Sequence, residues 1–118
     1  MSIQIPGLDT KKALDLYDDD LEMYVFVLRS YITNMPSTIK ELKNLSKETL
    51  ENYVIKAHGI KGTSANIGAE ELRQTALKME TLAKSNDLDA LQAQNPDFIN
   101  QIEDLVSNIQ KWLDENDV

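Results

Sequence analysis

The feature that most constrains the fold is the spacing of the apolar residues, which repeats every three or four positions along almost all of the 118-residue chain. Such spacing places apolar side chains on one face of an α-helix, whereas a half-buried strand needs strict alternation. No clear alternating stretch occurs, and the hairpin dipeptides Asn-Gly and Asp-Gly are absent from the sequence. The sequence therefore predicts an all-α protein.

Capping residues and breaks in the spacing divide the first half of the chain into two helices. The first is short and is predicted from its N-cap Asp9 to about Tyr17. The acidic run 18–20 suits the start of the second, because carboxylates favour the positive end of the helix dipole. The spacing continues to Leu45, past Pro36, which either kinks this helix or begins its next segment.

Two further helices are predicted on either side of a glycine. Ser46 is the predicted cap of the third helix. This helix is expected to end near Gly68, because glycine stabilises the left-handed turn just past a helix. The fourth helix is predicted from about Ala69 to Ala83.

The last helix is predicted after the polar stretch 85–94, which is interpreted as a connection with at most a helical turn of its own. Asn95 is its predicted cap and Pro96 its first residue, where the missing N–H costs nothing. Its apolar face carries Phe98, Ile102, Leu105, Ile109 and Trp112. Four long amphipathic helices with short links predict an antiparallel up-down-up-down four-helix bundle, with a short extra N-terminal helix, in a single domain over residues 1–118.

Composition narrows the classes of function. The chain has 12 Lys and Arg against 20 Asp and Glu, and its net charge of -8 disfavours nucleic acid and anionic membranes as partners. It has no cysteine, which excludes disulfides, thiol nucleophiles and cysteine-based zinc sites. The N-terminus lacks the apolar core of a signal peptide, and no run approaches the roughly 18 apolar residues of a membrane span. The expectation is a cytoplasmic monomer.

The stretch AHGIKGTSANIGA, residues 57–69, holds the single histidine and three of the four glycines. On a helix, Lys61 and Gly62 lie one turn after His58, and Ala65 lies two turns after it. Gly62 has no side chain and Ala65 a small one, so the imidazole is predicted to stand clear for a large partner. The alternative, an ordinary polar histidine beside closely packed helices, stays open.

Two neighbours of this histidine lead to separate hypotheses. Gly59 points about 100° away from His58 around the helix, and close helix packing is the hypothesis to test first. An antiparallel helix that starts after Gly68 returns to the height of His58 near Glu80. This carboxylate is predicted to accept a hydrogen bond from one ring nitrogen and to leave the other as an outward nucleophile. A solvated glutamate paired with Lys84 is the alternative.

A motif in this stretch resembles the signature of histidine-containing phosphotransfer (HPt) domains, which serve bacterial two-component phosphorelays. It follows the pattern H-x-x-K-G-x-S-x-x-I-G, with His58, Lys61, Gly62, Ser64, Ile67 and Gly68. The segment 5–31, with a short helix and a tyrosine-bearing second one, also looks like the start of that family. The resemblance covers nearly the whole chain.

The resemblance implies that His58 is phosphorylated by the aspartyl phosphate of a response-regulator receiver domain and passes the group to another receiver. Lys61 would help to neutralise the phosphoryl group, Gly62 would give clearance for docking, and Glu80 would hydrogen-bond the imidazole. Receivers and hybrid histidine kinases are the implied partners. The chain would need no cofactor of its own, because Mg²⁺ is expected from the receiver.

The predicted partner-binding residues are Ile55, one turn before His58, together with Gly62 and Ala65, although Ile55 also fits the core. An exposed apolar residue beside a reactive group is a common anchor. No glycine-rich phosphate loop is present, so autonomous kinase activity is not expected. Two alternatives remain: the phosphotransfer domain of a larger hybrid or chemotaxis-type kinase, and a helical adaptor without phosphate chemistry.

Overall fold

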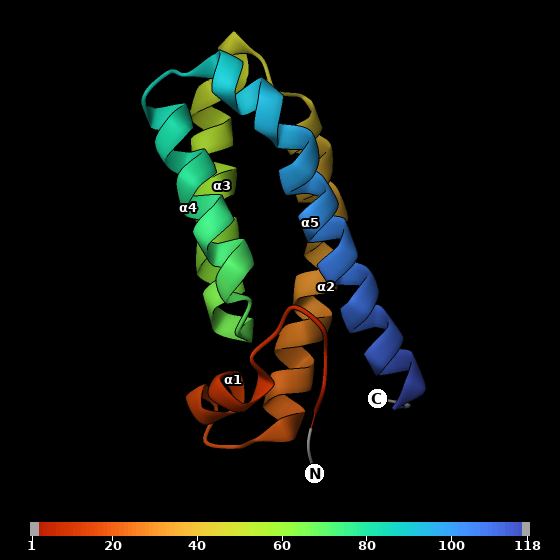
Figure 1. The fold of residues 1–118 in the computed structure, drawn as a ribbon. Helices are drawn as coiled ribbons and strands as arrows, with labels where there is room; N and C mark the ends of the chain where they lie inside the picture. The colour runs from red at the N-terminus through yellow and green to blue at the C-terminus, as the bar shows by residue number, and fades with distance from the viewer. Residues whose placement is uncertain (1–2, 117–118) are drawn as a thin grey trace.

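The computed structural model describes residues 3–116, and this part of the chain is helical without any strand (Figure 1). A single 3₁₀ turn, η1 (Lys47–Thr49), precedes the third helix. The helices are α1 (Thr10–Leu16), α2 (Leu21–Lys43), α3 (Leu50–Ile67), α4 (Glu70–Lys84) and α5 (Leu88–Glu115). The predicted all-α class is confirmed.

The four long helices run alternately up and down the bundle in chain order (Figure 1). Helix α3 packs against α2 and α4, and α5 packs against the other sides of α2 and α4. Helix α1 lies across the end where α2 begins and α3 ends. The bundle is elongated, with extents of 46 × 23 × 18 Å. This is the antiparallel arrangement that short links between amphipathic helices predict.

The core runs along the bundle and takes apolar side chains from all four long helices. Its largest fully buried members include Tyr24, Leu28, Leu42, Ile67, Met79, Phe98, Ile102 and Ile109. The apolar face predicted for the last helix is confirmed, except that Trp112 lies at its edge and is half-buried. None of the helices within residues 3–116 is both long and apolar enough to span a membrane.

The predicted start of the last helix is wrong. Helix α5 begins at Leu88, and its N-cap Asp87 accepts a hydrogen bond from the backbone N–H of Ala90 at 3.2 Å. Asn95 and Pro96 lie inside this helix. The Asn95 side chain is buried in the core, so it does not cap a helix; Pro96 lies on the exposed face.

Other helix boundaries follow the capping pattern more closely. Asp9 caps α1 as predicted, and its carboxylate accepts from the Lys12 N–H at 3.1 Å. Pro36 lies within one continuous α2 and does not begin a new segment. That helix ends at Lys43, two residues before the predicted Leu45. Ser46 caps η1 in a capping box with Thr49, and α3 itself starts only at Leu50.

The C-terminal end of α3 is fastened to the N-terminal part of the chain. Gly68 caps α3 in the left-handed conformation, φ +83°, as predicted. The carbonyl groups of residues 66–68 accept hydrogen bonds from Tyr17 Oη, Tyr24 Oη and the Asp9 N–H, at 2.8, 2.9 and 2.9 Å respectively. These bonds satisfy carbonyl groups that a helix end otherwise leaves unpaired. They fix the position of the helix that carries His58.

Candidate functional site

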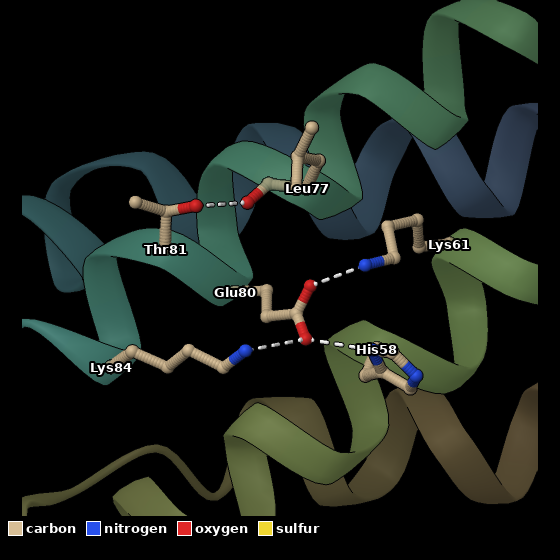
Figure 2. A network of polar contacts seen from close by, with 6 residues as sticks. All are labelled: His58, Lys61, Leu77, Glu80, Thr81 and Lys84. Atoms are coloured by element: carbon tan, nitrogen blue, oxygen red, sulfur yellow. Dashed lines mark hydrogen bonds and ion pairs between the residues drawn. The ribbon is translucent and has the colours of Figure 1, made fainter.

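His58 lies midway along α3 on its outward face, with 64% of its side chain exposed. Opposite it on α4 lies Glu80, whose side chain is only 3% exposed. The imidazole Nδ1 is 2.7 Å from Glu80 Oε2 (Figure 2). The structure therefore brings together the two residues that the turn at Gly68 was predicted to align.

Two lysines complete the contacts of the Glu80 carboxylate. Lys61 Nζ donates to Oε1 at 2.9 Å, and Lys84 Nζ lies 3.3 Å from Oε2 (Figure 2). The hydrogen bond from Lys61 is the main cause that lowers the pKa of Glu80 to about 2, with smaller contributions from His58 and Lys84, although burial opposes the shift. Glu80 is therefore ionised throughout the physiological pH range.

The ionised carboxylate determines the tautomer of the imidazole. A carboxylate without a proton can only accept hydrogen bonds, so the proton of a neutral imidazole must be on Nδ1. The other ring nitrogen, Nε2, then carries a lone pair. Because His58 is largely exposed, this nitrogen is available to a partner as a nucleophile.

The two glycines near His58 lie on open surface. A Cβ atom added to Gly59 or to Gly62 would meet no atom within 4 Å, other than the neighbouring backbone of the same helix. The close-packing hypothesis for Gly59 is therefore wrong, because no other helix approaches it. Gly62 and Ala65 are both exposed. Neither has a side chain larger than a methyl group, so no bulky side chain stands at these two positions, as the spacing predicted.

Ile55 is exposed, with 65% of its surface accessible, so its alternative placement in the core is excluded. It lies on the face of α3 that carries His58, one turn earlier. On α4, Leu77 is also partly exposed, at 43%. Apolar surface is thus available on both helices that form the site.

Lys84 belongs to this site, although the sequence predicted it only as the ion-pair partner of a solvated Glu80. The spacing of four residues from Glu80 indicated an ion pair on a solvated helix face. The ion pair exists, but Glu80 is buried and contacts His58 and Lys61 as well. Glu80 lies at the border between the buried and the exposed face of α4. Whether a carboxylate at such a border is buried depends on tertiary packing, which helical spacing alone does not predict.

Two other observations concern the possible metal ligands and the motif serine Ser64. Within residues 3–116 there is no group of three or more His, Cys, Asp or Glu side chains that would hold a metal ion. Ser64 of the motif is fully buried, and its Oγ lies 3.4 Å from Tyr31 Oη. This serine joins α3 to α2, and its burial keeps it away from a partner at His58.

Comparison with known proteins identifies the family. A family model described as "Hpt domain" matches residues 27–112. The chain is 28% identical over 106 residues to the "Phosphorelay intermediate protein rdeA" of Dictyostelium discoideum, and the match covers 86% of this chain and 42% of that protein. The chain thus spans less than half the length of this relative. No solved structure matches the chain significantly. The chain belongs to the Hpt domain family.

Proposed function

We propose that this chain is a histidine phosphotransfer module of a phosphorelay, with His58 as its phosphorylated residue. Family membership and the resemblance to a phosphorelay intermediate support this function. His58 is the only histidine in the chain. The observation that carries the proposal is the different environment of the two ring nitrogens. Nδ1 contacts the buried Glu80 carboxylate, and the exposure of the imidazole makes Nε2 accessible to a partner.

In the proposed reaction, the donor is the aspartyl phosphate of a receiver domain. The Nε2 lone pair attacks phosphorus in line, the bond between phosphorus and the aspartate oxygen breaks, and its electron pair leaves with the carboxylate. The Nδ1 proton stays in place, so no general base is needed. Transfer to a second receiver reverses these steps.

Charge and position are the main requirements of such a transfer, because the charge of its transition state is spread over three phosphoryl oxygens. Lys61, Lys84 and the Glu80 carboxylate give the surroundings of His58 a local charge of +1, within a chain of net charge -8. Lys61 is proposed to neutralise part of the phosphoryl charge. Mg²⁺ is expected from the acidic pocket of the receiver.

The receiver is proposed to dock over the outward face of α3. Ile55 would supply an apolar anchor, and Gly62 and Ala65 would allow close approach to the imidazole. The exposure of Ile55 and the empty space around Gly62 support this placement. We further propose a cytoplasmic location and a monomeric state. Size-exclusion chromatography with light scattering tests the monomeric state.

The experiment that tests the function is incubation of the chain with phosphorylated receiver domains. We expect a phosphoryl label that is labile to acid and stable to base, and that disappears in the His58→Gln variant. Labelling that survives this substitution would contradict the proposal, as would failure with every receiver of the source organism. Equal partner binding by wild type and His58→Ala, without phosphohistidine, would favour an adaptor instead.

A further inference from the structure

A groove with a volume of about 830 Å³ lies between α2 and α5. These two helices form one side of the bundle, and α3 and α4, which carry His58 and Glu80, form the other (Figure 1). The apolar lining of the groove comes from Ile32, Pro36 and Ile39 of α2 and from Val106 of α5. Pro36 is exposed and the other three are only half-buried, so apolar surface remains accessible along both helices.

The charged side chains that line this groove are mostly acidic. Glu103, Asp114 and Glu115 face a single lysine, Lys111, so three carboxylates against one ammonium group give a net charge of -2. Lys111 lies 4.0 Å from Glu115, and Asp114 accepts a hydrogen bond from Gln110. Glu103 is exposed and has no hydrogen bond or ion pair with any residue in the described range 3–116. The groove therefore offers carboxylates to a cationic partner.

Two features of the backbone favour a cationic partner as well. The last turn of α5 contains Asp114 and Glu115 and no basic residue, although the negative end of a helix dipole favours cations. In α2, Pro36 has no N–H, so the Ile32 carbonyl lacks its helical donor. Both of these residues line the groove. A partner with positively charged N–H donors would complement the helix end and the carbonyl together.

We propose that this groove binds a basic amphipathic helix of a partner protein. Its apolar side chains would cover Ile32, Ile39 and Val106, and its lysine or arginine side chains would lie beside the carboxylates of α5. From Glu103 to Glu115 the helix rises about 18 Å, so about three turns of the bound helix would cover the groove. This binding goes beyond the proposed phosphotransfer and does not depend on it, and it leaves His58 free for a receiver.

A second copy of the chain fits the groove less well. In a symmetric dimer the same surface of both chains meets. Such a contact would bring six carboxylates together with two lysines, twice the set that lines one groove. Charge therefore favours a basic partner over self-association.

The experiment titrates the whole ¹⁵N-labelled chain with a synthetic helical peptide of about 14 residues, with leucine on one face and lysine on both flanks. We expect saturable NMR shifts at the backbone amides that line the groove, including those of Ile32, Ile39, Val106 and Gln110. The amides around His58 should not shift. The same peptide with glutamate in place of lysine should not bind.

Two neighbouring charge reversals provide a matched comparison. Glu103→Lys should weaken binding at least about threefold, because it replaces an attraction in the groove by a repulsion. Asp104→Lys changes the net charge equally, but Asp104 lies about 100° further around α5. It lines a different groove, beside Pro6 and Gly7. Both acidic residues are exposed, and the Asp104→Lys variant should bind nearly as well as wild type.

Several outcomes would overturn this inference. They are the absence of saturable shifts, shifts centred outside the groove, binding of the glutamate peptide, and equal weakening by the two variants. Shifts in the groove that depend on protein concentration without peptide would assign it to a second copy and would overturn the inference too. All of these results would leave the proposed function intact, because labelling of His58 tests it separately.

Discussion

At the scale of single residues, the site depends on a carboxylate that is almost inaccessible to water yet ionised. Glu80 is 3% exposed, and burial alone would raise its pKa. Hydrogen bonds from Lys61, His58 and Lys84 outweigh this cost and lower the pKa to about 2. The same contacts orient the imidazole, so the electrostatics of Glu80 and the nucleophilicity of His58 have one structural cause.

The lowered pKa of Glu80 predicts a contribution to stability that depends on pH. Its folded-state pKa of about 2 lies below its ordinary value of 4.5, so the folded state binds this proton less readily than the unfolded state. The contribution is therefore present above pH 4.5 and is lost as the pH falls towards 2. Urea unfolding across this range should show a shallower loss of stability for Glu80→Gln. Identical slopes would contradict the assignment.

Substitutions at Gly59 and Gly62, which both lie on open surface, are expected to affect phosphotransfer differently. Replacement of either Gly59 or Gly62 by alanine should raise the free energy of unfolding by about 1 kcal/mol, because nothing obstructs the added methyl group. Glutamine at position 62 should slow transfer from a receiver at least about tenfold, which is about 1.4 kcal/mol of barrier. Gly59→Gln is the control.

This comparison checks the proposed clearance beside His58. The side chain at position 59 points about 100° away from the imidazole. Urea unfolding gives the stabilities, and the kinetics of label transfer from a phosphorylated receiver give the rates. Equal slowing by both glutamine variants would argue against a specific role of Gly62.

At the scale of helices, α5 shows how a buried polar residue joins three elements. The Asn95 amide donates to the Leu42 carbonyl of α2 at 2.9 Å, and its oxygen accepts from Tyr53 Oη of α3 at 2.7 Å. These two hydrogen bonds fix the position of α5 along the bundle axis relative to α2 and α3. The asparagine therefore serves the alignment of the bundle, and Asp87 caps the helix.

This assignment predicts that Asp87→Ala lowers the free energy of unfolding by about 1 kcal/mol, the usual effect of a lost N-cap. Asn95→Ala should cost more, about 1–3 kcal/mol, because the Leu42 carbonyl and the Tyr53 hydroxyl lose a buried partner. Chemical denaturation measures both. A neutral Asp87→Ala would indicate that the helix starts later, as the sequence pattern had predicted.

The helical class, the Asp9 cap and the turn at Gly68 could be predicted because each depends on local chemistry: apolar spacing, a capping carboxylate, and a residue that adopts positive φ. The alignment of Glu80 with His58 followed from helix geometry after that turn. The role of Asn95 could not be predicted, because an asparagine before proline is a good local cap, and only tertiary contacts show otherwise. The burial of Glu80 beside Lys84 could not be predicted either, because it also depends on tertiary contacts.

At the scale of the whole molecule, the N-terminal part and the phosphotransfer helix form one unit. The last carbonyl groups of α3 are bonded to Tyr17, Tyr24 and the Asp9 backbone. On the other side of the bundle, α5 holds α2 and α4 together. His58 is thus presented from a helix that is fixed at its end and along both flanks, which suits a reaction that depends on position.

Gly68→Ala should disturb this unit as a whole. Its φ is +83°, and an added Cβ would lie 2.5 Å from the Asp9 carbonyl oxygen, so the turn and the N-terminal segment cannot both keep their places. We expect the free energy of unfolding to fall by about 1–3 kcal/mol. Trp112 fluorescence reports on α5 and circular dichroism on all helices; their urea midpoints should fall together, because all helices share one core. Unchanged stability, or midpoints that separate, would show that the N-terminal segment is not part of the cooperative bundle.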